Sequence, residues 1–131
     1  MNQSSLRQYI ETRFQNNWTL TPIVFENNDY SPNLTTPYIE LEIEHEETYQ
    51  INATDRQVFR NTGLIVFKIF VPTNSGTYNT RVYIDEIAKL FAGKQFNNIT
   101  TRSLRTEKIG KIDEWYLNIA MIEYYFDSFI E

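Results

Sequence analysis

At positions 38–44 the sequence reads Tyr38-Ile39-Glu40-Leu41-Glu42-Ile43-Glu44, a strict alternation of apolar and acidic residues after the tyrosine. Successive side chains of a β-strand point to opposite faces, so this period of two predicts a strand with one buried and one solvated face. A second run, 64–71, is apolar in both alternating sets except at Lys68. That pattern predicts a strand covered on both faces, in the middle of its sheet. Together the two runs predict that a β-sheet forms the centre of the fold.

Two other segments repeat their apolar residues at helical spacing. The first runs from about residue 5 to residue 16 and places Leu6, Tyr9, Ile10 and Phe14 on one face. The second ends before Gly93, a residue that suits the left-handed conformation common at the ends of helices. Its predicted apolar stripe consists of Tyr83, Ile84, Ile87, Ala88 and Phe91.

Three further strands are predicted, at 21–25, 96–104 and 115–126, with a turn at Gly110-Lys111. The polar segments 27–37 and 46–61 lack clear periodicity and are expected to be loops. The order is therefore one helix, three strands, a second helix and two strands. No crossover-helix repeat appears, which does not favour a doubly wound sheet. We predict a single α+β domain over residues 1–131, with two helices packed on one face of a mainly antiparallel β-sheet.

Composition removes several classes of function. The 131 residues are 15% aromatic, which excludes a disordered chain, and 17 acids against 12 bases argue against a general nucleic-acid binder. There is no cysteine and one histidine, His45, so thiol catalysis, disulfides and multi-histidine metal sites are excluded, and no cofactor is expected. No apolar run approaches the ~20 residues that cross a bilayer, and the first residues lack the pattern of a signal peptide. We expect a soluble protein without a membrane partner, made in a cytoplasm.

The densest charged cluster lies at 40–47, where six of eight residues are Glu or His. Two carboxylates on the same face of a strand lie roughly 7 Å apart, a separation that a glycosidase can use. Strand alternation turns Glu40, Glu42 and Glu44 toward open solvent, however, and like charges in a row also suit an edge strand that must not pair with another chain. We therefore predict no catalytic residue. A small carbohydrate-binding or hydrolytic domain that uses Glu40 and Glu42 is the alternative.

Charge is distributed unevenly along the chain. Residues 1–60 carry nine acids and four bases, residues 61–105 two acids and six bases, and residues 106–131 six acids and two bases. The basic middle is too sparse for a typical nucleic-acid patch. It could form one half of a self-complementary contact between subunits, or it could be an ordinary solvated surface.

Several short segments carry a family resemblance through their order along the chain. They are Thr21-Pro22-Ile23-Val24-Phe25-Glu26-Asn27, Phe59-Arg60-Asn61-Thr62-Gly63-Leu64-Ile65-Val66, Phe70-Val71-Pro72 with Gly76, the helix end Asp85-Glu86-Ile87-Ala88-Lys89-Leu90-Phe91-Ala92-Gly93, and the closing Gly110 and Trp115-Tyr116. From about Leu6 to Phe126, the chain resembles the tail terminator-like (tail completion) proteins of tailed bacteriophages. No single motif is specific, and the ordered set carries the likeness.

The resemblance implies a structural virion protein of the phage tail or neck and not an enzyme. Proteins of that family form a ring, typically a hexamer, which caps the completed tail tube and presents a surface to the neck or head connector. The implied partners are other copies of this chain, the tail tube protein and a neck or head-completion protein, with DNA only in transit through the lumen. We expect Glu40, Glu42 and Glu44 to line or border that lumen, where an acidic wall would repel phosphate.

Aromatic residues are favoured at the centres of interfaces, and the two predicted loops offer contact surface. The interface candidates are Tyr30, Tyr49, Phe59 and Arg60. Ordinary packing of these residues on their own domain is an equal alternative. Two other readings of the whole chain also remain, a head-tail joining protein of the neck and a generic monomeric domain.

Overall fold

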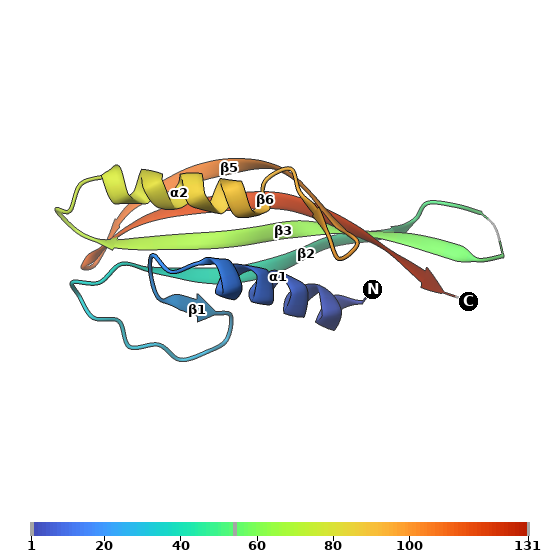
Figure 1. The fold of residues 1–131 in the computed structure, drawn as a ribbon, viewed down its shortest axis with the longest axis horizontal. Helices are drawn as coiled ribbons and strands as arrows, with labels where there is room; N and C mark the ends of the chain where they lie inside the picture. Colours follow the sequence, from blue (N-terminus) through green and yellow to red (C-terminus); the bar gives the residue numbers. More distant parts are fainter. Residues whose placement is uncertain (1, 54, 131) are drawn as a thin grey trace.

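The protein is described here from a computed structural model, which covers residues 2–53 and 55–130 (Figure 1). Its elements in chain order are α1 (Gln3–Asn17), β1 (Ile23–Phe25), β2 (Tyr38–Gln50), β3 (Gln57–Pro72), α2 (Tyr78–Phe91), β4 (Gln95–Phe96), β5 (Ile99–Ile112) and β6 (Trp115–Ile130). The predicted α+β class is therefore confirmed. Within the described residues, no helix is long and apolar enough to cross a membrane.

The six strands form one sheet in the order β1-β2-β3-β6-β5-β4. β1 runs parallel to β2, and every other neighbouring pair is antiparallel. β3 lies between β2 and β6, as its apolar sequence predicts. The turn predicted at Gly110-Lys111 is wrong, because β5 continues to Ile112 and the chain reverses at 113–114. Gly110 instead lies at a β-bulge with a φ of 101°, a conformation that glycine adopts without steric cost.

Both helices pack on one face of the sheet, as predicted (Figure 1). Leu6, Ile10 and Phe14 of α1 are at most 1% exposed, and they meet the buried side chains of α2 and the central strands. The Phe14 ring lies 5.2 Å from the Phe67 ring of β3 and 6.0 Å from the Phe91 ring of α2. Burial of each such side chain contributes roughly 1.5–3 kcal/mol, so this aromatic contact joins both helices to the sheet.

The other face of the sheet carries no helix, yet part of it is also buried. Val66 is 4% exposed and Leu64 is 9% exposed on this face. Near one end, the Tyr38 ring stacks on Phe70 at 4.6 Å and meets the edge of Trp115 at 5.1 Å. The expectation that β3 is covered on both faces therefore holds, although neighbouring side chains provide the second cover. We call this surface the helix-free face.

The prediction of a loop at 46–61 is wrong. β2 extends to Gln50 and β3 begins at Gln57, so most of this segment continues a long hairpin. A bulge between His45 and Glu47 shifts the register by one residue, which interrupts the alternation by which strands are recognised in a sequence. The segment 27–37 does lack helix and strand, as predicted.

Candidate subunit interface

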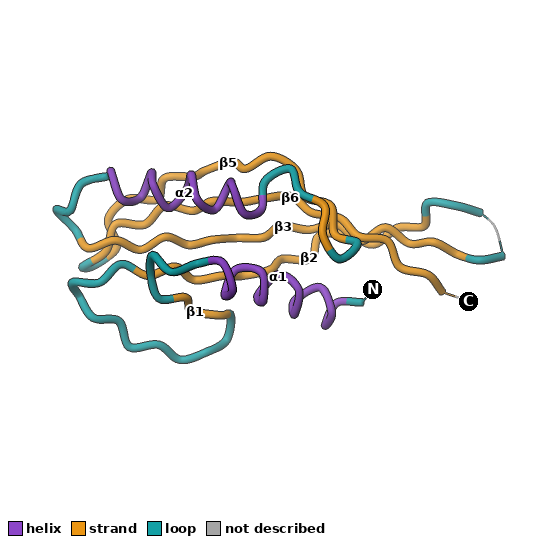
Figure 2. The backbone as a smooth tube through the Cα atoms, in the orientation of Figure 1, coloured by secondary structure: helices purple, strands orange, loops and turns teal. Residues whose placement is uncertain are grey.

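Three strands extend beyond the part of the sheet that the helices cover. The hairpin of β2 and β3 projects past α1, and the end of β6 pairs with β3 as far as Gln57↔Ile130 (Figure 2). β5 begins only at Ile99, opposite Phe126, so it accompanies little of this extension. We call the segments 46–50, 57–61 and 126–130 the arm. Three of the four predicted interface candidates lie on it.

Tyr49 and Arg60 are directly paired across β2 and β3. Residues opposite each other in a ladder share a face, so both side chains lie on the helix-free face of the arm. Tyr49 is 42% exposed, whereas Phe59 belongs to the opposite face and is half-buried. The arm thus presents Tyr49 and Arg60 together, while Phe59 lies partly in the domain's own packing.

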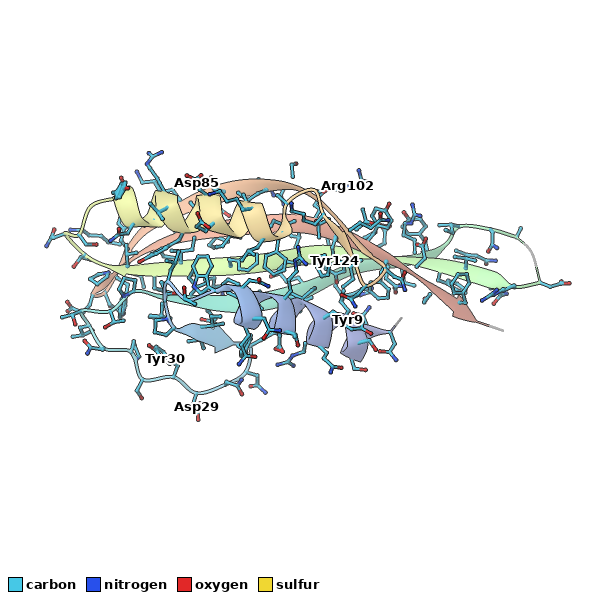
Figure 3. All side chains as sticks on the ribbon, in the orientation of Figure 1. Tyr9, Asp29, Tyr30, Asp85, Arg102 and Tyr124 are labelled. Carbon is cyan, nitrogen blue, oxygen red and sulfur yellow. The ribbon has the colours of Figure 1, made fainter. Side chains whose placement is uncertain are left out.

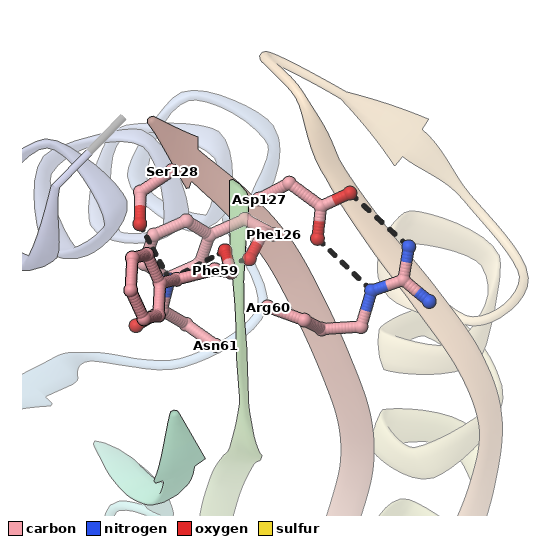
Figure 4. Close-up of polar contacts among 6 residues, drawn as sticks. All are labelled: Phe59, Arg60, Asn61, Phe126, Asp127 and Ser128. Carbon is pink, nitrogen blue, oxygen red and sulfur yellow. Dashed lines mark hydrogen bonds and ion pairs between the residues drawn. The ribbon is translucent and has the colours of Figure 1, made fainter. Parts of the chain in front are cut away.

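Arg60 is held in place by two kinds of contact. Its Nε and Nη2 donate to the two carboxylate oxygens of Asp127 at 2.9 and 3.1 Å (Figure 4). Its guanidinium also lies 4.3 Å from the ring centre of Tyr125. The hydrogen bond to Asp127 raises the pKa of Arg60 from its usual value. A bidentate pair stacked on an aromatic ring fixes the orientation of the guanidinium more firmly than a simple ion pair would.

Asn61 connects all three strands of the arm, and sequence reasoning does not single it out. It is 6% exposed. Its amide donates to the Phe126 carbonyl at 3.4 Å and to the Ser128 hydroxyl at 3.1 Å (Figure 4). Its side-chain oxygen accepts a 2.8 Å hydrogen bond from the Thr48 hydroxyl. Asn61 lies between Arg60 and Thr62 in a polar segment, so the sequence gives no signal for this role.

Two shallow hollows lie on either side of Arg60 and Tyr125, both of which line each hollow. One also includes Glu46, Tyr49 and Arg102, and the other includes Asp127 and Phe129. Phe129 is 54% exposed. An exposed aromatic side chain beside a fixed arginine is typical of protein interfaces, where Tyr, Phe and Arg are enriched.

Tyr30 does not join this cluster. It lies on the segment between β1 and β2, near the end of the molecule away from the arm (Figure 3). Its ring lies 4.9 Å from that of Tyr38, which in turn stacks on Phe70. Tyr30 thus extends the aromatic cluster of the helix-free face, and the four candidates divide between two ends of the protein.

Glu40, Glu42 and Glu44 share the helix-free face, but they do not form an open acidic surface. The Glu42 carboxylate forms a 2.9 Å ion pair with Lys68 of β3. Both Glu40 and Glu42 are half-buried. Burial, followed by hydrogen bonding with Glu42, raises the pKa of Glu40 from its usual value. Only Glu44 is exposed. The expectation of three solvated carboxylates is therefore wrong for two of them, because Lys68 on the next strand projects to the same face.

No group of three or more His, Asp or Glu side chains among residues 2–53 and 55–130 is arranged to hold a metal ion. His45 is exposed and its Nε2 lies 2.8 Å from the Thr48 hydroxyl. The exposed features of this structure are thus open strand ends, shallow polar hollows and exposed aromatic side chains. They define a small α+β protein with strand edges and aromatic side chains of the kind found at protein interfaces.

Comparison with known families agrees with this class. Residues 5–115 match the family described as phage tail terminator protein, and the chain belongs to that family. This confirms the resemblance found in the sequence. The family is one of structural proteins of the phage tail and not of enzymes. Membership also indicates a component of the virion.

One solved structure is similar to this chain, with a TM-score of 0.73 and 17% sequence identity. The match covers 100% of this chain and 99% of the other chain. At that identity the likeness concerns the fold alone. Among curated proteins, none matches this chain.

Proposed function

We propose that this protein forms a hexameric ring that caps the tail tube, ends tube polymerisation and provides the surface to which the neck or head connector binds. The observation that carries the proposal is the family match over residues 5–115. In this mechanism the face of the ring toward the tube matches the last layer of tube subunits, and the opposite face does not. Polymerisation stops because no further tube subunit finds its contact surface. The ring would assemble on the tube in the host cytoplasm.

The arm supports a role in such contacts. It is a three-stranded extension that places Tyr49 and Arg60 opposite each other on one face. Two hydrogen bonds to Asp127 hold Arg60 there. We assign these two residues to a contact with another copy or with the tube protein. Tyr30, at the other end of the molecule, is assigned to a second contact surface, and Phe59 to support of the arm.

The position of Glu40, Glu42 and Glu44 bears on the passage of DNA. In our proposal the helix-free face of β2 lines or borders the lumen of the ring. The ion pair with Lys68 neutralises part of its charge, so Glu44 provides most of the repulsion of phosphate in this region. A ring structure with Glu44 on its outer rim would disprove this assignment.

The proposed function is tested by removal of the gene from the phage and electron microscopy of the resulting particles. A terminator is required to stop the tube, so we expect tails of excessive and variable length, and restoration of uniform tails when the gene is supplied in trans. Normal free tails that fail to join filled heads would instead identify a head-tail joining protein of the neck.

The contact role of the arm has its own test. Tyr49→Ser in the complementing gene should reduce the number of particles with correctly terminated tails. Tyr78→Ser is the matched control, since Tyr78 is 74% exposed on α2, outside the arm. Equal complementation by the two variants would contradict a contact role for Tyr49.

A further inference from the structure

The two edges of the sheet carry opposite charge. The segment 23–50, which forms the β1–β2 edge, contains seven acids and no Lys or Arg. The segment 94–112, which forms the β4–β5 edge, contains five bases and one acid. In Figure 1, β2 and β5 lie on opposite sides of the central pair β3 and β6. Folding thus places an acidic segment and a basic segment at opposite edges of one molecule.

Few of these charges are neutralised within the described part of the chain. Among the acids of the β1–β2 edge, Glu42 alone forms an ion pair there, with Lys68. No base of the β4–β5 edge takes part in an ion pair between described residues, and Arg102 lies 5.5 Å from the ring of Tyr125. The basic residues of this edge are Lys94, Arg102, Arg105, Lys108 and Lys111, all exposed. These charges are therefore available to a partner.

The backbone of both edges is also open over much of its length. β1 pairs with β2 only at Ile39–Leu41, so the outer side of β2 has no strand partner from Glu42 onward within the described residues. β4 pairs with β5 only at Ile99 and Thr100, and the outer side of β5 has no strand partner from Ser103 to Ile112 in the same part of the chain. Open edges present unpaired N–H and C=O groups to a neighbouring molecule.

We propose that neighbouring copies of this chain contact each other head to tail, with the acidic β1–β2 edge of one copy against the basic β4–β5 edge of the next. Contact between two identical edges would bring like charges together, which is unfavourable in an interface. Contact between different edges leaves one free edge of each kind at the ends of the assembly, so further copies can be added. Such an assembly becomes a ring when the rotation from each copy to the next closes, as the proposed function requires. The inference rests on the proposed function, because it assigns the contact that holds that ring together.

Charge reversal tests the contact. One variant, Glu44→Lys with Glu46→Lys and Glu47→Lys, gives the open part of β2 at 42–50 three bases and one acid. Another, Arg105→Glu with Lys108→Glu, gives the open part of β5 at 103–112 three acids and one base. All five side chains are exposed. Each variant alone then carries two edges of the same sign, so we expect its self-association, measured by sedimentation velocity at low ionic strength, to be weaker by roughly tenfold or more. An equimolar mixture should restore association, because the reversed β2 edge of one variant matches the reversed β5 edge of the other, and the two unchanged edges match each other. Native mass spectrometry should then show the two variants in equal number.

Matched controls carry the same change of charge elsewhere. One control is Asp55→Lys with Asp85→Lys and Glu114→Lys, and the other is Arg81→Glu with Lys89→Glu. Both alter exposed residues outside the two edges and should associate as the unaltered protein does. If the edge variants assemble normally, this inference is wrong, but the proposed ring is not contradicted. If each edge variant fails to self-associate and the mixture of the two also forms no one-to-one complex, the inference is wrong as well. The tail-length experiment decides the proposed function separately, since it does not depend on which surfaces meet.

Discussion

Tyr124 of β6 lies directly opposite Gly63 of β3 and fills the space where a side chain at position 63 would lie. A Cβ atom on Gly63 would be 2.5 Å from the Tyr124 hydroxyl and 2.1 Å from the Glu44 carbonyl oxygen. The bulge between His45 and Glu47 lies next to this position. The glycine therefore allows a large aromatic side chain and a bulged strand to approach the centre of the sheet at the base of the arm.

Gly63→Ala should destabilise the protein by about 2–3 kcal/mol, because the neighbouring backbone of β2 must move to admit the new methyl group. Denaturant unfolding measures this change. Gly93→Ala is the comparison, since no atom lies within 4 Å of its added Cβ and only its φ of 62° is unfavourable. It should cost about 1–2 kcal/mol. A Gly63→Ala protein as stable as the unaltered one would show that the hairpin is free to shift.

Tyr124→Phe should leave the free energy of unfolding at neutral pH unchanged or slightly raised. The Tyr124 hydroxyl is buried and has no hydrogen-bond partner among the described residues. Its removal therefore relieves the cost of an unsatisfied polar group without breaking a bond. Denaturant unfolding at pH 7 measures the difference. A loss above about 1 kcal/mol would reveal a partner for the hydroxyl, such as a bound water.

Tyr124 also predicts a loss of stability at alkaline pH. Burial, with a smaller contribution from the charge of Glu46, raises the pKa of Tyr124 from 10.0 to about 12. In the unfolded chain the phenol ionises near its ordinary pKa, so stability is complete below pH 10 and falls as the pH rises toward 12. The decline should be shallower in Tyr124→Phe than in the unaltered protein. Parallel curves of unfolding free energy against pH would contradict the shift.

Arg60 and Asp127 should be energetically coupled. Both side chains are 31% exposed, which limits the contribution of their ion pair to about 1 kcal/mol or less. Arg60→Lys cannot keep both hydrogen bonds, so it should lose most of this coupling. A double-mutant cycle with Arg60→Ala and Asp127→Ala, followed by denaturant unfolding, gives the value. Additive effects of the two substitutions would show that the pair contributes nothing to the rigidity of the arm.

Glu40→Gln should make the protein slightly more stable at pH 7. The folded protein raises the pKa of Glu40 through burial and through hydrogen bonding with Glu42. A carboxyl with a raised folded pKa favours folding below its unfolded pKa and loses that contribution as the pH rises through the folded pKa. The gain from the substitution should therefore be present at pH 7 and absent at acidic pH. Thermal unfolding across this range compares the two proteins, and a destabilising substitution at pH 7 would refute the expectation.

Phe14→Ala should cost about 3–5 kcal/mol, because it leaves a cavity between α1, α2 and the sheet. Phe14 is fully buried and its ring meets those of Trp18, Phe67 and Phe91. Phe129→Ala is the control, since Phe129 is 54% exposed and should change stability by about 0.5 kcal/mol. Similar losses for the two variants in denaturant unfolding would argue against a core centred on Phe14.

The hydrophobic pattern predicts the central strands and both helices because burial on one face repeats with the period of each element. Four of the strands, however, extend beyond the segments that the sequence predicts: β2, β3, β5 and β6. In the arm the periodicity is lost at the bulge after His45, and polar residues such as Asn61 are buried by hydrogen bonding. A polar residue that is satisfied by distant partners looks, in the sequence, like part of a loop.

The candidate interface is predictable only in part for the same reason. Tyr49 and Arg60 stand out as an aromatic and a charged residue in a polar segment, but their common face depends on the pairing of β2 with β3. Asp127, which fixes Arg60, comes from a strand 67 positions away. Tyr30 carries the same sequence signal as Tyr49, yet the fold places it at the other end of the molecule.

The sequence by itself determines the α+β class, the place of β3 in the sheet, the two helices on one face and the phage tail family. These properties follow from local periodicity and from the order of short segments, both of which are written along the chain. Tertiary structure alone decides that Lys68 neutralises Glu42, that Arg60 is fixed by Asp127 and that the acidic and basic segments lie at opposite edges of the sheet. The physical reason is that side-chain contacts and the position of each edge depend on strand pairing, which joins residues far apart in the sequence.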